Sequence, residues 1–208
     1  MADNAKTVRG KYQRLARFYD FLDVPFEKRR YSALRRQLLS GATGRLLDAG
    51  VGTGRNIAYY PPAVQPTGID LSAAMLARAA QRSASLGTPV ELLEMDALHT
   101  TFPDGHFDCI VSSFMFCVLD DTHQLPALKE LGRICRPGGQ IRILEYAISE
   151  VPLKRAVMRL WAPWVRWAYG ATFDRNTEQY LPAAGLTLLE KRFVFGDIIK
   201  LIVATPGE

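Results

Sequence analysis

The sequence predicts an α/β fold, in which a doubly wound and mostly parallel sheet carries helices on both faces. After residue 40, short apolar runs alternate with helical patterns, as in successive βαβ units. One of these runs, FDCIVSSFMF at 107–116, is apolar without alternation, which is typical of a strand buried on both faces. With 208 residues and 48% hydrophobic composition, the chain is expected to build one sizeable core.

The first half of the fold follows from three segments. Residues 45–50 read as a buried strand, followed by a short helix from Arg55, and residues 65–70 read as a second strand. The next segment, LSAAMLARAAQRSASLG, is helical throughout, with Ser72 as a plausible N-cap and Gly87 as a plausible end.

The second half continues the alternation. Residues 90–97 and 107–116 predict the third and fourth strands, 122–134 a helix that ends at RPGG, and 140–147 a fifth strand. The tail, GLTLLEKRFVFGDIIKLIVATP, predicts two more strands with Gly196-Asp197 at or near the turn. This antiparallel hairpin would close one edge of the sheet.

Charge is concentrated at the N-terminal end of the chain. Residues 1–40 hold ten bases and four acids, a net charge of +6, against +5 for all 208 residues. Such a segment favours an anionic partner, either a membrane or a nucleic acid. A nucleic acid is the weaker alternative, because we recognise no RNA-binding module and the predicted α/β fold uses nearly the whole length.

Neither a metal site nor a disulfide framework is expected. Three cysteines lack CxxC spacing, and three histidines lack HxxxH or HExxH spacing. Buried thiols in a reducing cytosol fit this pattern. The polar N-terminus does not resemble a secretory signal, and no apolar run reaches the roughly 18 residues of a membrane span, so we expect a cytoplasmic protein.

The segment LLDAGVGTGRN, residues 46–56, places three glycines beside one acid at the end of the first strand. Ligands of open parallel sheets bind at such ends, and glycines let a ligand approach the backbone closely. A dinucleotide GxGxxG loop would need glycine where Arg55 stands, and no P-loop lysine follows. Asp70 ends the second strand, where it can bind a ribose or cap the next helix; the two roles are compatible.

Five motifs in order then give a specific resemblance: LLDAGVGTG, GIDLS, EMDA, FDCIVSS and RPGG. Their order and spacing resemble the class I S-adenosylmethionine-dependent methyltransferases, within them the small ubiquinone/menaquinone-methyltransferase-like group. The resemblance extends over about residues 12–146 and more loosely over the hairpin. It implies a Rossmann-like, seven-stranded sheet, with residues 41–208 as the methyltransferase domain.

The resemblance also implies the cofactor, S-adenosyl-L-methionine, and the residues that bind it. The methionine end would lie along Asp48 and the backbone of Gly50, Gly52 and Gly54, with Asp48 facing the ammonium through water or a neighbouring amide. Asp70 would accept from both ribose hydroxyls. Leu71, Met75, Asp96, Ala97 and Leu98 would surround the adenine, with Asp96 accepting from its amino group. Ser112 would lie near the sulfonium.

Methyl transfer from a sulfonium needs position and electrostatics more than a fixed catalytic triad. An amine acceptor must first lose a proton, and a tyrosine can take it. Tyr19 and Tyr146 are the candidate bases, with Tyr12 on the same helix face as Tyr19 and Glu145 beside Tyr146 at the cleft mouth. Packing of Tyr12 and Tyr19 on the core is an equal alternative. For His123, a solvated helix start is the favoured interpretation.

Two segments bear on the acceptor. Residues 1–40 interleave bases with aromatic residues, as expected of amphipathic lid helices on an anionic membrane or of a solvated basic face. Residues 151–185 carry Trp161, Trp164 and Trp167 among basic side chains, as expected of a lipid–water interface or of a helix that buries aromatics over the sheet. Pro163 is expected to break or start a helix there.

These features predict a peripherally membrane-associated enzyme with a small amphipathic or lipid acceptor. Bacterial phospholipid N-methyltransferases and membrane-associated thiol methyltransferases have similar segments. A phosphatidylethanolamine-type amine is therefore the first choice, with thiol or sulfide S-methylation and quinol C-methylation as alternatives. Arg175 could hold an anionic group or form a structural salt bridge. A non-catalytic cofactor- or membrane-binding protein is the alternative of another class; the oligomeric state is left open.

Overall fold

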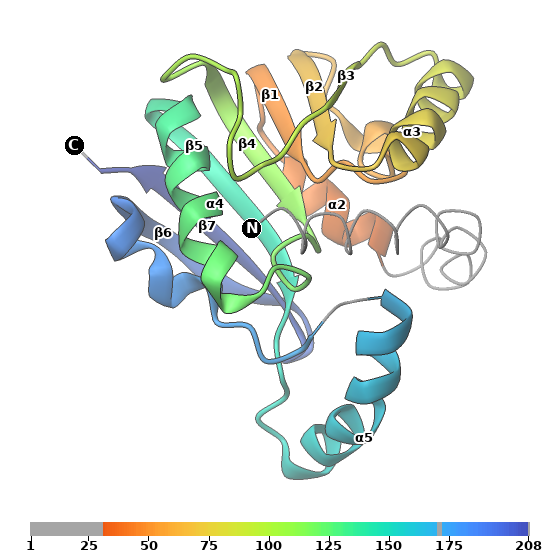
Figure 1. Ribbon diagram of the computed structural model, residues 1–208, viewed down its shortest axis with the longest axis vertical. Coiled ribbons are helices and arrows are strands. Elements are labelled where there is room, and N and C mark those ends of the chain that lie inside the picture. Colours follow the sequence, from red (N-terminus) through yellow and green to blue (C-terminus); the bar gives the residue numbers. More distant parts are fainter. Residues whose placement is uncertain (1–30, 170–171, 208) are drawn as a thin grey trace.

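A seven-stranded sheet forms the centre of the computed structural model, which describes residues 31–169 and 172–207 (Figure 1). The strands are β1 Gly44–Ala49, β2 Val64–Asp70, β3 Glu91–Glu94, β4 Phe107–Ser113, β5 Cys135–Tyr146, β6 Leu186–Phe195 and β7 Ile199–Pro206. The helices are α2 Ser32–Leu39, α3 Ala73–Leu86, α4 Asp121–Ile134 and α5 Pro152–Tyr169, with 3-10 turns at Ile57–Tyr59, Thr177–Tyr180 and Pro182–Ala184.

The strand order is β3-β2-β1-β4-β5-β7-β6. Strands β1 to β5 run parallel, whereas β7 is antiparallel to both β5 and β6. The predicted doubly wound sheet with a C-terminal antiparallel hairpin is therefore confirmed. The chain reverses its direction of winding between β1 and β4, and ligands of such sheets bind at that point.

Helices cover both faces of the sheet, because successive strand residues point to opposite sides. Leu47 of β1 packs in one fully buried cluster with Leu128 and Leu131 of α4. Its neighbour Leu46 packs in the other cluster with Leu38 of α2. Helix α2 lies within the segment 1–40 that we assigned to a lid, yet its leucines belong to this core. The domain boundary at residue 40 stays a prediction.

Helix α3 begins and ends at the predicted residues. The Ser72 hydroxyl accepts a hydrogen bond from the Met75 N–H, and Gly87 adopts the left-handed conformation that ends many helices.

Three local predictions were wrong. The segment RPGG belongs to β5, which starts directly after α4 at Cys135, and the β4–β5 register shifts at this point. Strand β4 ends at Ser113, because Phe114 takes a positive φ of 59° that leaves the strand. The expected helix from Arg55 is a single 3-10 turn at Ile57–Tyr59.

Helix α5 lies beyond the carboxyl end of β5, apart from the sheet (Figure 1). It runs through Pro163, which we had expected to break or start a helix. Among the described residues, α5 included, no helix combines the length and apolar character needed to cross a bilayer.

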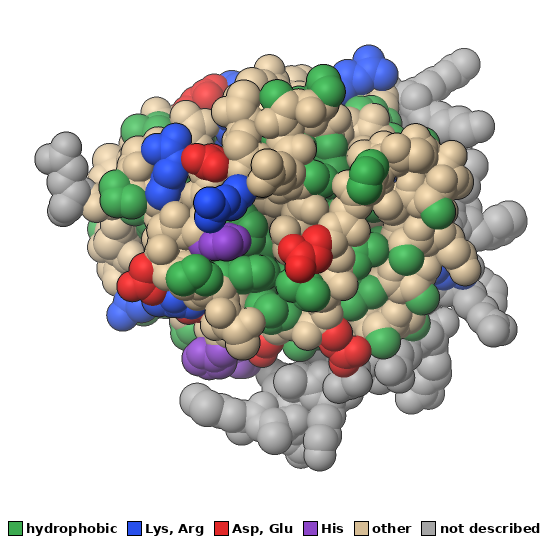
Figure 2. Space-filling view, turned by 90° about the horizontal axis from the view of Figure 1, so that it is seen from above, with side chains coloured by type: hydrophobic (Ala, Val, Ile, Leu, Met, Phe, Trp, Pro, Cys, Tyr) green, Lys and Arg blue, Asp and Glu red, His purple; other side chains and the backbone are tan. Residues whose placement is uncertain are grey.

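The opposite end of the molecule, seen from above in Figure 2, carries acidic and basic side chains interspersed with apolar ones. Such mixing of charge is ordinary for a globular surface. The features that distinguish this protein therefore lie at the carboxyl ends of the strands.

Candidate functional site

A cavity of about 470 Å³ opens at the carboxyl ends of β1 to β5. Its size falls within the range of small-molecule sites in proteins. Each of these strands ends at or next to residues that line it: Gly50 after β1, Asp70 of β2, Met95 after β3, Ser113 of β4 and Tyr146 of β5. The cavity thus lies at the sheet's point of reversal, where sequence analysis placed the ligand.

The glycine loop is held against β2 by one carboxylate. Asp70 Oδ2 accepts from the Gly52 N–H at 3.0 Å, and Asp70 Oδ1 accepts from the Ser72 N–H at 2.9 Å. Gly50 has φ +72°, and a Cβ there would lie 2.9 Å from Met115 Sδ. Burial raises the pKa of Asp70, against these two N–H donors, which lower it. Gly50, Gly52 and Asp70 all line the cavity, as predicted from the sequence.

Apolar side chains form the next part of the wall. Asp96 lies among them, and its Oδ1 accepts from the Leu98 N–H at 2.9 Å. Mostly apolar walls with a few placed polar groups are typical of small-molecule sites. The lining residues here are Leu71, Met75, Met95, Asp96, Ala97, Leu98, Met115, Val118 and Leu119, which include the residues that we assigned to the adenine.

Asp48 lies behind the wall of the cavity and is fully buried. Its carboxylate accepts from Asn56 Nδ2 at 2.9 and 3.1 Å and from the Tyr60 hydroxyl at 2.7 Å. Burial raises the pKa of Asp48 to about 6, although both donors lower it. The Asn56 amide lies next to Asp48 but does not line the cavity, so the role of Asp48 toward the cofactor ammonium stays a prediction.

Arg35 of α2 is the functional candidate that sequence analysis missed. It is buried, lines the cavity and donates through Nη1 to Asn56 Oδ1 at 2.6 Å and to Ser113 Oγ at 3.2 Å. These contacts fix a cation close to the glycine loop. In the sequence, Arg35 is one of the ten bases in residues 1–40. We interpreted these bases together as a surface for anionic partners, and nothing else in the sequence singled out Arg35.

Besides Asp48, two more residues assigned to the cofactor do not line the cavity. Ser112 is fully buried on the other side of β4, and Ser113 takes the place that we gave it. Gly54 packs the loop against α3, where an added Cβ would lie 3.0 Å from the Ala79 Cα. Gly54 therefore supports the loop from behind.

Four aromatic side chains line the end of the cavity away from Asp70: Tyr31, Phe114, Tyr146 and Phe173. The hydroxyls of Tyr31 and Tyr146 are 2.8 Å apart. Tyr31 meets Phe114 edge to face at 5.6 Å, and Tyr146 meets Phe173 at 5.7 Å with planes at 90°. Phe114 reaches this place through its positive φ, a strained conformation that is concentrated at functional sites. Below, this set is called the aromatic end.

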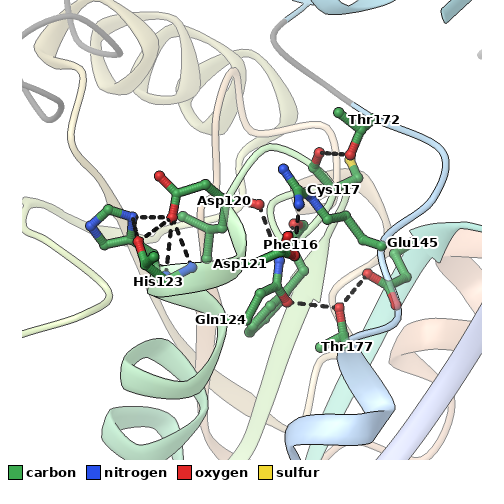
Figure 3. A network of polar contacts seen from close by, with 12 residues as sticks. Phe116, Cys117, Asp120, Asp121, His123, Gln124, Glu145, Thr172 and Thr177 are labelled. Carbon is green, nitrogen blue, oxygen red and sulfur yellow. Dashed lines mark hydrogen bonds and ion pairs between the residues drawn. The ribbon is translucent and has the colours of Figure 1, made fainter.

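Glu145 points away from the cavity, because it precedes Tyr146 on the same strand. It is fully buried, lies 3.2 Å from Lys200 Nζ, and is bonded to the Thr177 hydroxyl at 2.8 Å (Figure 3). Burial raises its pKa. The prediction that Glu145 and Tyr146 face the same cleft mouth was therefore wrong, and Glu145 joins β5 to the turn at Thr177–Tyr180.

The Thr177 hydroxyl lies between two acceptor side chains. Gln124 Nε2 donates to the Phe116 carbonyl at 2.8 Å, so Gln124 Oε1 is an acceptor and lies 2.9 Å from the Thr177 hydroxyl. That hydroxyl has one proton for two acceptors. Thr177 therefore links Gln124 of α4 to Glu145 of β5.

Arg175 also lies outside the cavity, and its Nη1 donates to Asp121 Oδ1 at 2.7 Å. Of the two roles that we considered for it, the structural salt bridge is the one observed. His123 contacts Asp120 at the start of α4, at 2.6 Å. Tyr12 and Tyr19 lie outside the described residues, which contain no group of three potential metal ligands.

Asp48 should make stability depend on pH in a definite window. Its folded pKa of about 6 lies above the ordinary value of 3.8, so the folded state holds the extra proton between these values. The contribution of Asp48 to stability is therefore fully present below pH 3.8 and is lost as pH rises through 6, by about 3 kcal/mol. In urea unfolding without ligand, the free energy of unfolding of Asp48→Asn, taken relative to that of the parent protein, should rise by that amount between pH 4 and 7. If the free energies of unfolding of the two proteins change with pH in the same way, the assignment to Asp48 is contradicted.

Known proteins share both sequence and fold with this chain. A family model described as "Methyltransferase domain" matches residues 46–139. The phosphatidylethanolamine N-methyltransferase of Cereibacter sphaeroides is 39% identical over 139 residues, which cover 65% of this chain and 66% of that one. The ubiquinone/menaquinone biosynthesis C-methyltransferase UbiE of Burkholderia mallei (strain SAVP1) is 30% identical over 162 residues, with coverages of 74% and 66%. The matches thus span just under two thirds of each relative.

Solved structures share the fold at lower identity. Geranyl diphosphate C-methyltransferase from Streptomyces coelicolor A3(2), in complex with S-adenosyl-L-homocysteine, aligns with TM-score 0.68 and 16% identity over 86% of this chain and 81% of that one. The [4+2]-cyclase SpnF aligns with TM-score 0.67 and 22% identity over 86% and 82%. Together with the glycine loop and Asp70, these findings show that the chain carries a methyltransferase domain, which the family model matches over residues 46–139.

Proposed function

We propose that the protein transfers a methyl group from S-adenosylmethionine to a membrane-partitioning amine, with a phosphatidylethanolamine-type phospholipid as first choice. The aromatic end of the cavity is the observation that carries the proposal. A relative named for this reaction supports it, at 39% identity.

The residues present fit the cofactor. Asp70 keeps lone pairs for ribose hydroxyls beyond its two backbone contacts, and the apolar wall around Asp96 suits an adenine. Arg35 is placed to bind the carboxylate of the methionine end. The cofactor supplies an electrophilic methyl group on a sulfonium, and the protein must supply position and a dry surrounding.

The aromatic end fits a nitrogen acceptor. Aromatic faces attract ammonium groups, and methylated ammonium ions are bound by aromatic cages. Phe114 and Tyr146, 4.8 Å apart, present such surface beside Ser113. The acceptor amine must be neutral to attack, and either Tyr31 or Tyr146, once ionised to a tyrosinate, can take the proton from its ammonium form at the same place. Tyr146 therefore stays our candidate base within the described residues, and Tyr31 joins it.

The exposed face of α5 fits a membrane. Leu153 and Leu160 are 76% and 80% exposed, and Trp164 lies on the same face of the helix. Large exposed apolar patches mark interaction sites, and tryptophan favours the lipid–water interface. Val165 of α5 lines the cavity, so a lipid held at this face is close to the aromatic end. We therefore propose that the protein associates peripherally with a membrane through α5. Most of the basic segment 1–40, the other segment predicted to contact a membrane, lies outside the described residues.

Quinol C-methylation is the second candidate. The UbiE relatives are named for it, and a quinol ring can stack on the same aromatic side chains. The two candidates differ in charge, because a quinol carries no ammonium.

The acceptor is tested with methyl-labelled S-adenosylmethionine and the purified protein. Parallel reactions contain anionic vesicles with or without phosphatidylethanolamine, a short-chain quinol, or an alkyl thiol. We expect label in the organic phase that depends on the ethanolamine lipid. Label only with the quinol or the thiol would replace the proposed acceptor, and intact cofactor binding without label on any acceptor would favour the non-catalytic alternative.

Asp70→Ala should weaken the binding of S-adenosylhomocysteine at least tenfold, since a partly buried acceptor of two ribose hydroxyls is lost. Titration calorimetry measures the affinity, and circular dichroism checks that the variant is folded. Asp104→Ala serves as the control, because it also removes one acid but lies outside the cavity. Equal affinities of the two variants would remove Asp70 from the site.

Replacing Leu160 and Trp164 with Gln should reduce binding to anionic vesicles at least tenfold, because burial of each large apolar side chain contributes about 1.5–3 kcal/mol. Vesicle flotation measures the bound fraction. The control replaces Leu188 and Leu189, exposed on β6, with Gln. If both variants bind as the parent protein does, α5 is not the membrane surface.

A further inference from the structure

A second hollow lies against the inner side of α5. It has a volume of about 610 Å³ and is formed between α5 and residues 172–174. Arg159 and Arg166 line it from the helix, and Phe173 lines it from the opposite segment. We call this hollow the arginine groove.

The two arginines lie on one face of α5, because they are seven positions apart. The exposed apolar residues Leu153 and Leu160 lie on a different face of the same helix. Both arginines line the groove and remain exposed to solvent, so their guanidinium groups are accessible to a ligand. Neither arginine has a carboxylate partner in the part of the chain that the structure describes.

The arginine groove adjoins the aromatic end. Phe173 lines both the groove and the first cavity. Val165, which lines the first cavity, directly precedes Arg166. One molecule can therefore place a cationic or amine group at the aromatic end and an anionic group in the groove.

We propose that the arginine groove binds the phosphate group of the acceptor while the acceptor amine lies at the aromatic end. Guanidinium groups bind phosphate oxygens through paired, charge-assisted hydrogen bonds. In an ethanolamine phosphodiester, a short two-carbon link joins phosphate and amine, and the two sites share Phe173 as a lining residue. The inference rests on the proposed function, because it takes the acceptor to be an amine.

The proposal also explains why α5 is amphipathic in this way. The exposed apolar face holds acyl chains or the membrane surface, and the arginines of the groove draw the headgroup toward the aromatic end. Arg175, our earlier candidate for this role, is instead paired with Asp121. Asp174 also lines the groove, so the site keeps a single net positive charge that suits a phosphodiester.

Methyl transfer to phosphatidylethanolamine vesicles tests the proposal with single variants. Arg159→Gln and Arg166→Gln should each raise KM about tenfold and leave kcat within about twofold, because only acceptor binding is changed. Lys154→Gln is the matched control: it removes one positive charge from the same helix but does not line the groove. A change in KM equal to that of the control would overturn the proposal.

A binding experiment separates the source of the phosphate. Ligand-detected NMR with S-adenosylhomocysteine present compares glycerophosphoethanolamine, ethanolamine and inorganic phosphate. We expect glycerophosphoethanolamine to bind best and to lose about tenfold in affinity in either arginine variant. Equal binding of inorganic phosphate and glycerophosphoethanolamine would make the groove a free-phosphate site and overturn the acceptor assignment.

The two experiments also separate failure of this inference from failure of the proposed function. If label is transferred to phosphatidylethanolamine and the arginine variants have the KM of the parent protein, the proposed function holds and the role of the arginine groove is rejected. If no lipid is methylated, the proposed acceptor fails, and the NMR comparison alone decides whether the groove binds a phosphodiester.

Discussion

The site depends on one partly buried carboxylate, that of Asp70. It accepts from the backbone of the glycine loop after β1 and from the start of the segment that leads into α3, so it holds both to the end of β2. Such contacts compensate for much of the cost of burying the charge, yet burial still raises its pKa. A ligand with two hydroxyls can donate two more hydrogen bonds to this carboxylate and so stabilise its charge further. The loop, the helix start and the ligand site are therefore stabilised by the same group.

The cavity has two chemically different ends because the strands that meet there carry different residues. Near β1 and β2 the wall consists of bare backbone, Asp70 and the fixed guanidinium of Arg35. Near β4 and β5 it consists of aromatic side chains with one pair of hydroxyls. A charged cofactor fits the first end and a group with apolar or cationic character the second. In-line transfer needs the two reactants to meet between these ends, next to Ser113 and Phe114.

Patterns of short range allowed most of the fold and the cofactor loop to be predicted. Alternating strands and helices gave the sheet, and glycine spacing with Asp70 gave the loop. The direction of side chains near strand ends was harder to predict. Ser113 and Tyr146 point into the cavity, whereas Ser112 and Glu145 point away from it. An error of one residue in the predicted end of a strand reverses which side chains face the cavity. Arg35 and Phe173 could not be predicted, because long-range packing brings α2 and the 172–174 segment to the cavity.

A crystal structure of the protein with S-adenosylhomocysteine would test the central claim most directly, namely that the glycine loop and Asp70 hold the cofactor and leave the aromatic end to the acceptor. The account predicts ribose hydroxyls on Asp70, the amino-acid carboxylate near Arg35 and the sulfur turned toward Tyr146. A nucleoside bound at the aromatic end, or an Asp70 without contact to the ribose, would contradict it.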